Sequence, residues 1–183
     1  MDPYRYSPLS KFDNIRLLQV LPGRDPKKLR CKLLEYPLRS LDNSCHLYES
    51  LSYVWGSEDK PQSIIIDDLS ELKITQNLYN GLCRLQNSSF PRILWVDAIC
   101  INQSDDTEKQ HQIPLMAEIY ANASHVLVWL GEAEDCGGQA LIAINHVGQT
   151  SRKHVSHAEI DRNQILKLLQ RPWFQRIWVR EQS

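Results

Sequence analysis

Three short apolar runs, separated by segments with helical periodicity, constrain the fold of this chain more than any other feature. The runs lie at residues 47–55, 93–96 and 126–130. After the first run, Leu78, Leu82 and Leu85 recur at helical spacing behind Thr75, a residue type suited to cap a helix. Strands that alternate with helices predict an α/β fold, in which right-handed crossovers join a mostly parallel central sheet and helices flank it.

A second helix is predicted to open at Thr107, because its apolar residues share one face. These residues are Ile113, Met116, Ala117 and Tyr120. Pro114 lies inside this segment, so the helix should start late or be kinked there. Residues 138–147 and 159–170 also have helical spacing, and an aromatic, basic segment follows at 171–180.

Two β-hairpins are predicted beside these elements. The first joins residues 15–20 and 29–34 through a turn that contains Pro22 and Gly23, and the second joins 64–66 and 72–74. We expect the first hairpin to form an N-terminal β extension. The predicted organisation is therefore an extension with its connector at 1–46 and the main α/β domain at 47–183.

Composition excludes several functional classes. The 183 residues carry a net charge of −1, which gives no general attraction to nucleic acid. The longest apolar runs are far shorter than the roughly 20 residues that a membrane span needs, and the first residues do not resemble a secretory signal. A cytoplasmic protein with reduced thiols is expected, because five scattered cysteines do not suggest a disulfide framework. They are Cys31, Cys45, Cys83, Cys100 and Cys136.

Candidate functional residues lie where the three predicted parallel strands end, since ligands of open parallel sheets bind at the carboxyl ends of the strands. The sequence lacks the glycine patterns of dinucleotide-binding and P-loop proteins and the nucleophile elbow of hydrolases. The strand-end loops cover residues 55–58, 97–103 and 131–134. They offer carboxylates, amides and a tryptophan rather than a set of metal ligands.

Each candidate residue has a structural and a functional interpretation. Asp97 either caps backbone amides or acts as an acid, and Asn102 and Gln103 either contact a ligand or cap the next helix. Trp55, beside Gly56, is the tryptophan best placed to stack on a ligand.

Two other groups have simple structural interpretations. Cys100, upstream of His111, is either a thiol nucleophile or, as we favour, a buried core residue. The pair His154 and His157 lacks companion ligands, so no metal site is predicted.

Several sequence blocks in a fixed order resemble those of the fungal heterokaryon incompatibility (HET) domain. They span residues 48–56, 74–78, 94–103, 110–120, 126–131 and 171–178. The resemblance implies a module of fungal non-self recognition that triggers programmed cell death through contacts with other incompatibility proteins or by self-association. The function implied by the resemblance requires no cofactor.

The HET family has been thought remotely similar to TIR domains, which have a flavodoxin-like fold and in some members cleave NAD with a glutamate. That likeness implies an alternative, in which Asp97 and Glu181 are catalytic and NAD is the substrate. The implied ligand-binding residues are Ser52, Tyr53, Trp55, Gly56, Asn102 and Gln103. The family usually continues Trp-x-x-Gln-Glu in its last block, whereas Glu181 precedes Gln182 here. This departure suggests a third possibility, a shortened and inactive member.

Overall fold

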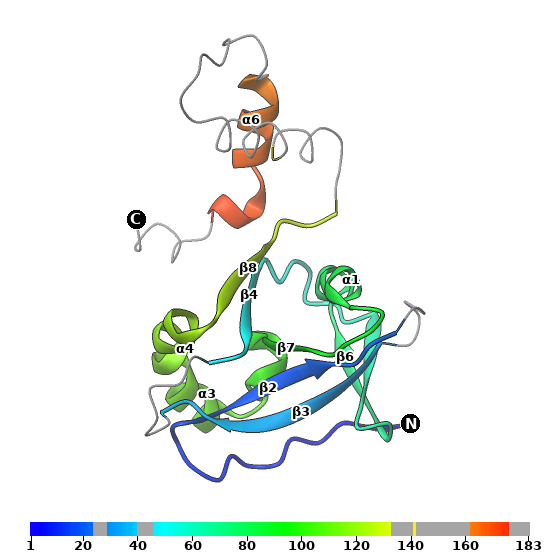
Figure 1. Cartoon of the computed structure of the whole chain (residues 1–183), viewed down its shortest axis with the longest axis vertical. Coiled ribbons are helices and arrows are strands. Elements are labelled where there is room, and N and C mark those ends of the chain that lie inside the picture. The colour runs from blue at the N-terminus through cyan, green and yellow to red at the C-terminus, as the bar shows by residue number, and fades with distance from the viewer. Residues whose placement is uncertain (24–28, 40–45, 133–140, 142–161, 176–183) are drawn as a thin grey trace. The chain divides into compact units, whose positions relative to one another are not determined.

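The computed structural model describes residues 1–23, 29–39, 46–132, 141 and 162–175. The chain divides into two compact units, Met1–Trp129 and Leu130–Ser183. Figure 1 labels the elements of both. The first unit contains the whole of the described sheet and all of the described residues predicted to form a site.

Among the described residues, eight strands form one sheet in the order β1-β6-β5-β3-β2-β7-β4-β8. Their bounds are β1 Asp2–Pro3, β2 Asn14–Val20, β3 Arg30–Pro37, β4 Glu49–Tyr53, β5 Gln62–Ile66, β6 Ser70–Ile74, β7 Arg92–Trp95 and β8 His125–Trp129. The three strands predicted to be parallel, β7, β4 and β8, are parallel neighbours. The α/β class is confirmed, but the sheet is mixed, because β2 runs antiparallel to both β3 and β7.

Both predicted hairpins form. β2 pairs with β3, and β5 pairs with β6 around Asp67 and Asp68, whose φ angles of 52° and 60° match a tight hairpin turn. β2 and β3 lie inside the sheet between β5 and β7. Six of the seven residues of β2 are buried, as expected for a strand covered on both faces.

The helices begin and end close to the predicted positions. α1 runs over Gln76–Leu85, and the Thr75 hydroxyl accepts a hydrogen bond from the Leu78 amide, which confirms the predicted cap. α2 is one turn, Asp97–Cys100, and α3 covers Asp106–Gln112. The predicted break at Pro114 is a 3₁₀ turn, Ile113–Leu115, between α3 and α4, Met116–Asn122.

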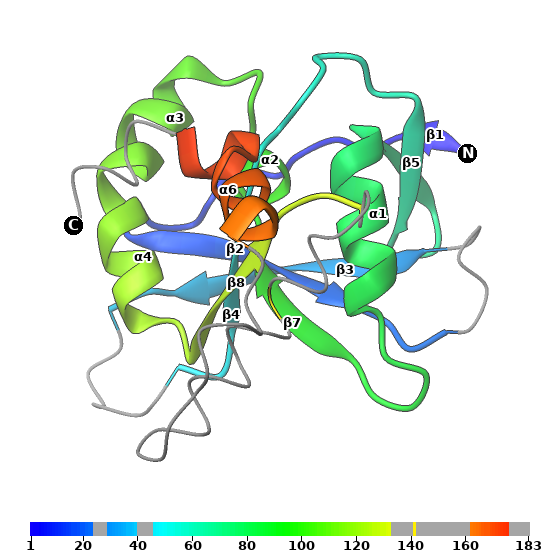
Figure 2. The same ribbon diagram turned by 90° about the horizontal axis from the view of Figure 1, so that it is seen from above.

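Helices cover both sides of the parallel strands. Figure 2 shows α1 on one side of β4 and β8 and α4 on the other. Trp129 of β8 bonds to Asn77 of α1, and the Tyr48 hydroxyl, just before β4, donates to the Ile119 carbonyl of α4. β4 between them is buried, and Trp95 of the neighbouring β7 is fully enclosed. This burial is the main force holding the unit together.

The second unit has one described α-helix, α6, Arg162–Leu169, within the helix predicted at 159–170. A 3₁₀ helix, Pro172–Gln175, follows, and the Arg171 guanidinium donates to the Leu130 carbonyl at 3.1 Å. The helix predicted at 138–147 lies, except for Leu141, outside the described residues. Within the described residues, no helix is long and apolar enough to cross a membrane.

Candidate functional site

The candidate site lies where β4, β7 and β8 end. β4 is the first of the three in sequence but lies between the other two, so the chain passes to one side of it and then to the other. In open α/β sheets such a reversal of strand order leaves a crevice outside the carboxyl ends. Trp55 follows β4, Asp97 follows β7, and Trp129 ends β8.

Trp55 and Asp97 are in direct contact. The indole Nε1 of Trp55 donates a hydrogen bond to Asp97 Oδ2 at 3.0 Å, and Asp97 Oδ1 accepts from the Ala98 amide at 2.8 Å. Asp97 is 8% exposed, whereas Trp55 is 42% exposed. The carboxylate therefore caps a backbone amide, as one interpretation predicted, and also fixes an indole whose ring remains accessible. A role for Asp97 as an acid stays a prediction.

The predicted loop after β7 is held by hydrogen bonds between its own residues and to α3. Gln103 Nε2 donates to the Asp97 carbonyl at 3.0 Å, so Gln103 joins Trp55 and Asp97. Asn102 contacts the segment that leads into α3. Its side-chain Oδ1 accepts a hydrogen bond from the Ser104 amide, and its backbone amide donates one to the Glu108 carboxylate at 2.7 Å. The cap of α3 is instead Asp105, whose side chain accepts from the Glu108 amide, so Asn102 and Gln103 hold the loop rather than cap the helix.

The remaining predicted residues have different environments. Ser52 and Tyr53 are buried in β4. Gly56 has a φ of +76°, a left-handed conformation that favours glycine, and a Cβ there would meet no other atom. Glu181 lies outside the described residues. The structure thus brings together Trp55, Asp97 and Gln103 from the predicted set.

Asn77 and Trp129 form a second bridge that the sequence interpretation did not assign to the site. Asn77 Nδ2 donates to the Val54 carbonyl at 2.6 Å, and Trp129 Nε1 donates to Asn77 Oδ1 at 2.8 Å. One amide side chain thereby joins the ends of β4 and β8 to α1. The signal available in the sequence was that Asn77 belongs to the block 74–78, one of those that resemble the HET domain.

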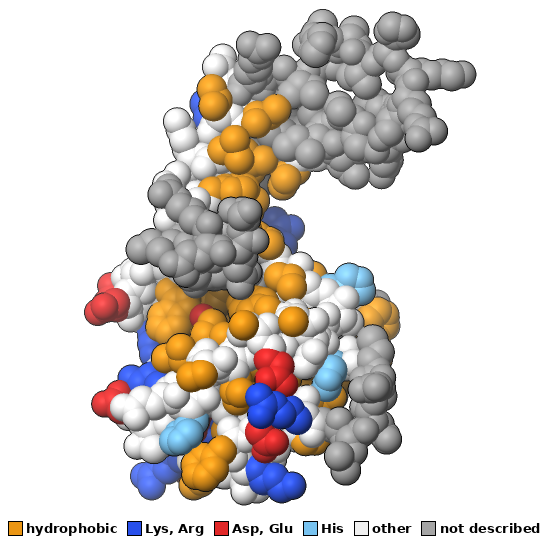
Figure 3. All heavy atoms as spheres, turned by 90° about the vertical axis from the view of Figure 1, so that its left-hand side faces the viewer, with side chains coloured by type: hydrophobic (Ala, Val, Ile, Leu, Met, Phe, Trp, Pro, Cys, Tyr) orange, Lys and Arg blue, Asp and Glu red, His pale blue; other side chains and the backbone are white. Residues whose placement is uncertain are grey.

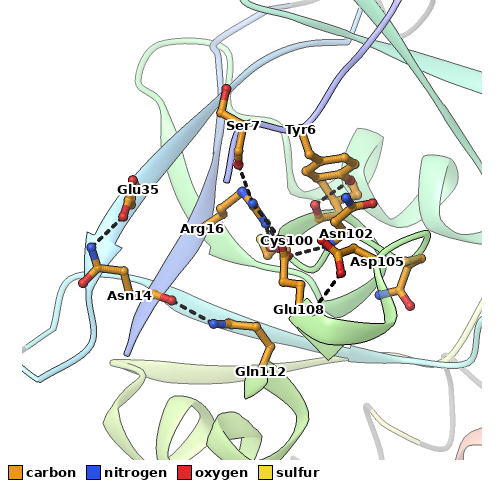
Figure 4. Close-up of polar contacts among 12 residues, drawn as sticks. Tyr6, Ser7, Asn14, Arg16, Glu35, Cys100, Asn102, Asp105, Glu108 and Gln112 are labelled. Carbon is orange, nitrogen blue, oxygen red and sulfur yellow. Dashed lines mark hydrogen bonds and ion pairs between the residues drawn. The ribbon is translucent and has the colours of Figure 1, made fainter. Parts of the chain in front are cut away.

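A buried ion pair supports the loop from below. Arg16 of β2 is 5% exposed and contacts Glu108 of α3, with Nη2 2.9 Å from Oε2. Arg16 also donates to the Cys100 carbonyl at 3.2 Å and to the Ser7 carbonyl at 2.7 Å (Figure 4). Its guanidinium lies 5.1 Å from the centre of the Tyr6 ring. The N-terminal segment, β2, α2 and α3 thus meet at one cation.

Cys100 is a buried core residue, the interpretation favoured from sequence. Its Sγ accepts from the Val96 amide at 3.3 Å, and burial raises the pKa of its thiol to about 12. A thiol held neutral in this way is a poor nucleophile. His111 Nδ1 lies 2.7 Å from the Thr107 carbonyl oxygen. Among the residues the structure describes, no group of three or more His, Cys, Asp or Glu could hold a metal, and His154 and His157 are not among them.

Comparison with known proteins identifies the family of this chain. The family model of the heterokaryon incompatibility protein (HET) matches residues 48–181. The chain is also 37% identical over 149 residues to "Heterokaryon incompatibility protein 6, OR allele" of Neurospora crassa, an alignment that covers 74% of this chain and 21% of that protein. No solved structure matches the chain. The chain thus spans about a fifth of the curated relative's length, and it belongs to the heterokaryon incompatibility (HET) family.

Proposed function

We propose that this chain acts as an incompatibility module in fungal non-self recognition, where it triggers programmed cell death through contacts with other incompatibility proteins or with itself. The observation that carries the proposal is the family match over residues 48–181, together with the similarity to an incompatibility protein of Neurospora crassa. The proposed location is the cytoplasm, where fused cells mix their contents.

The geometry at the strand ends supports a module that works by contact. Asp97, Gln103, Asn77 and Trp129 bond to one another or to nearby backbone, so these polar groups hold the fold of the loops. The partly exposed Trp55 ring is held in place beside them. A rigid, partly exposed aromatic is a common anchor in protein interfaces.

NAD cleavage is the alternative that this site allows. It rests on a proposed likeness of the parallel strands β7, β4 and β8 to flavodoxin-like and TIR folds. In that case Trp55 would stack on a base, and Asp97 and Asn102 would hold ribose hydroxyls. Fold likeness alone does not establish such chemistry.

Induced expression in a fungal host tests both ideas. Cell viability and NAD content would be followed together for the wild type, Asp97→Asn and the matched control Asp59→Asn, a change of an exposed carboxylate in the loop after β4. We expect all three chains to kill without a preceding fall in NAD, provided that circular dichroism shows them folded.

Two results would contradict the proposal. A fall in NAD that precedes death, with both abolished only in Asp97→Asn, would make the chain an enzyme. A folded wild type that causes neither death nor loss of NAD would identify an inactive member of the family.

A further inference from the structure

The two edges of the sheet differ in how well they are protected. One edge is β1, which has two residues, Asp2 and Pro3. A charge, a proline and short length are the usual protections of an edge strand, because they prevent another strand from adding to it. This edge is therefore blocked.

The other edge, β8, has none of these protections. Its five residues, His125–Trp129, pair with β4 along their whole length and contain no proline, lysine, arginine or acidic residue. No strand among the described residues pairs with its outer side. Alternate residues of a strand direct their backbone N–H and C=O groups to opposite sides, so β8 has outward donors and acceptors that no described strand pairs with.

The side chains of β8 add to this unprotected edge. Successive side chains of a strand point to opposite faces, so Val126 and Val128 share one face. They are 49% and 43% exposed, while Leu127 and Trp129 on the other face are partly buried. Figure 3 shows apolar side chains gathered on the side of the molecule where β8 and α4 lie, above a group of acidic and basic ones.

We propose that β8 pairs antiparallel with β8 of a second copy of this chain, across a two-fold axis through Leu127. In an antiparallel pair that uses all five residues, Leu127 of one copy lies opposite Leu127 of the second copy. Val126 then lies opposite Val128 of the second copy, and Val128 opposite its Val126. Directly opposed side chains in such pairs have Cβ atoms about 4.5–5.5 Å apart, so the four exposed valines cover one another.

The second copy is the occupant that the strand itself specifies. A two-fold contact requires a surface complementary to itself, and the sequence His-Val-Leu-Val-Trp places valine on valine and leucine on leucine. The strand carries no lysine, arginine or acidic residue, so pairing two copies brings no such side chains of like charge together. His125 lies opposite the indole of Trp129, an aromatic pair. The result is one continuous sheet through both copies, ended at each side by a protected β1.

This inference rests on the proposed function, because it names the self-contact through which the module would work. The first test measures the mass of the whole chain in solution over a range of concentrations, by sedimentation or by light scattering after gel filtration. We expect a monomer that becomes a dimer as concentration rises. Val128→Lys, which puts a charge on the edge, should remain monomeric. Leu69→Lys, at a residue 76% exposed in the β5–β6 turn, should dimerise like the wild type.

Disulfide crosslinking tests the register. In a chain with Cys45, Cys83 and Cys136 replaced by serine, Leu127→Cys should form a covalent dimer on mild oxidation. A mixture of Val126→Cys and Val128→Cys chains should crosslink several-fold faster than either variant alone. In the mixture, a cysteine at 126 of one copy lies opposite a cysteine at 128 of the other, whereas each variant alone places its cysteine opposite a valine. Leu69→Cys is the matched negative control.

The inference is overturned if the folded wild type stays monomeric at all concentrations, if Val128→Lys dimerises normally, or if Leu69→Cys crosslinks as fast as Leu127→Cys. A different result would contradict the proposed function. A chain that dimerises through β8 but does not kill would contradict the function alone, whereas a folded Val128→Lys monomer that kills normally would contradict this role for β8.

Discussion

Arg16 of β2 and Glu108 of α3 form a buried ion pair that lies beneath the loop between Asp97 and Gln103. Arg16 is 5% exposed and Glu108 11% exposed. The same carboxylate accepts the Asn102 amide, and the same guanidinium donates to the Cys100 carbonyl. The position of the candidate site therefore depends on a residue in a strand far from it in sequence.

Arg16→Met should destabilise the protein strongly, by about 3 kcal/mol, because it leaves the Glu108 carboxylate buried without its partner. Urea unfolding of the folded chain measures the loss. Arg30→Met is the matched control, since Arg30 pairs with Asp68 at the surface, where both side chains are about half exposed. That change should cost much less, because solvent screens an exposed pair. Equal losses in the two variants would show that burial of the Arg16 pair contributes nothing.

Trp55→Phe should cost about 1 kcal/mol of unfolding free energy, because it removes the donor to Asp97 and keeps an aromatic ring. Asp97→Ala should cost more, since it leaves both the Trp55 indole and the Ala98 amide without this acceptor. In a double-mutant cycle, the two losses should not add, with a coupling of about 0.5 kcal/mol or more. Strict additivity would mean that the hydrogen bond has no net effect on stability.

Gly81→Val should destabilise the unit by about 1–3 kcal/mol, because even a Cβ at Gly81 of α1 would lie 3.2 Å from the Trp129 indole. The indole has little room to yield, since its Nε1 is bonded to Asn77. Thermal unfolding followed by tryptophan fluorescence measures the effect. Arg84→Val introduces the same β-branched residue at an exposed position of α1 and should lower the melting temperature less.

Glu35→Gln should destabilise the protein at neutral pH and have little effect in acid. Hydrogen bonds from the Ser10 hydroxyl, from Asn14 and from the Ser10 amide lower the pKa of the Glu35 carboxyl. A carboxyl whose pKa is lower in the folded state stabilises the fold above its unfolded pKa, and this stabilisation is lost as pH falls through the folded pKa. The difference in melting temperature between variant and wild type should therefore shrink between neutral pH and about pH 3. A difference that grows on acidification would reverse the assigned sign.

Local patterns predicted the elements well because they depend on neighbours in sequence. The leucine spacing and Thr75 located α1, and Pro114 located the break between α3 and α4. The position of β2 in the middle of the sheet could not be predicted in this way. Strand order depends on pairing between distant segments, and an apolar run such as β2 fits an extension and a buried strand equally well.

The sequence predicted where the candidate site lies but not how its side chains contact each other. The ends of predicted strands identified Trp55 and Asp97 as neighbours on one edge. The bond between them, and the bridge from Asn77 to Trp129, depend on the directions of side chains that come from separate elements. Those directions are fixed by helix packing, which no spacing along the chain records. Residue types at strand ends could suggest where a site lies, but not which groups already bond to each other.

The central position of β2 and β3 has a practical consequence for anyone cloning this domain. The family match begins at residue 48, after both strands. A fragment that starts there would lose the strands between β5 and β7 and would expose two new apolar edges in the middle of the molecule. Such a fragment should precipitate when it is expressed, so the smallest piece that folds should include β2 and β3.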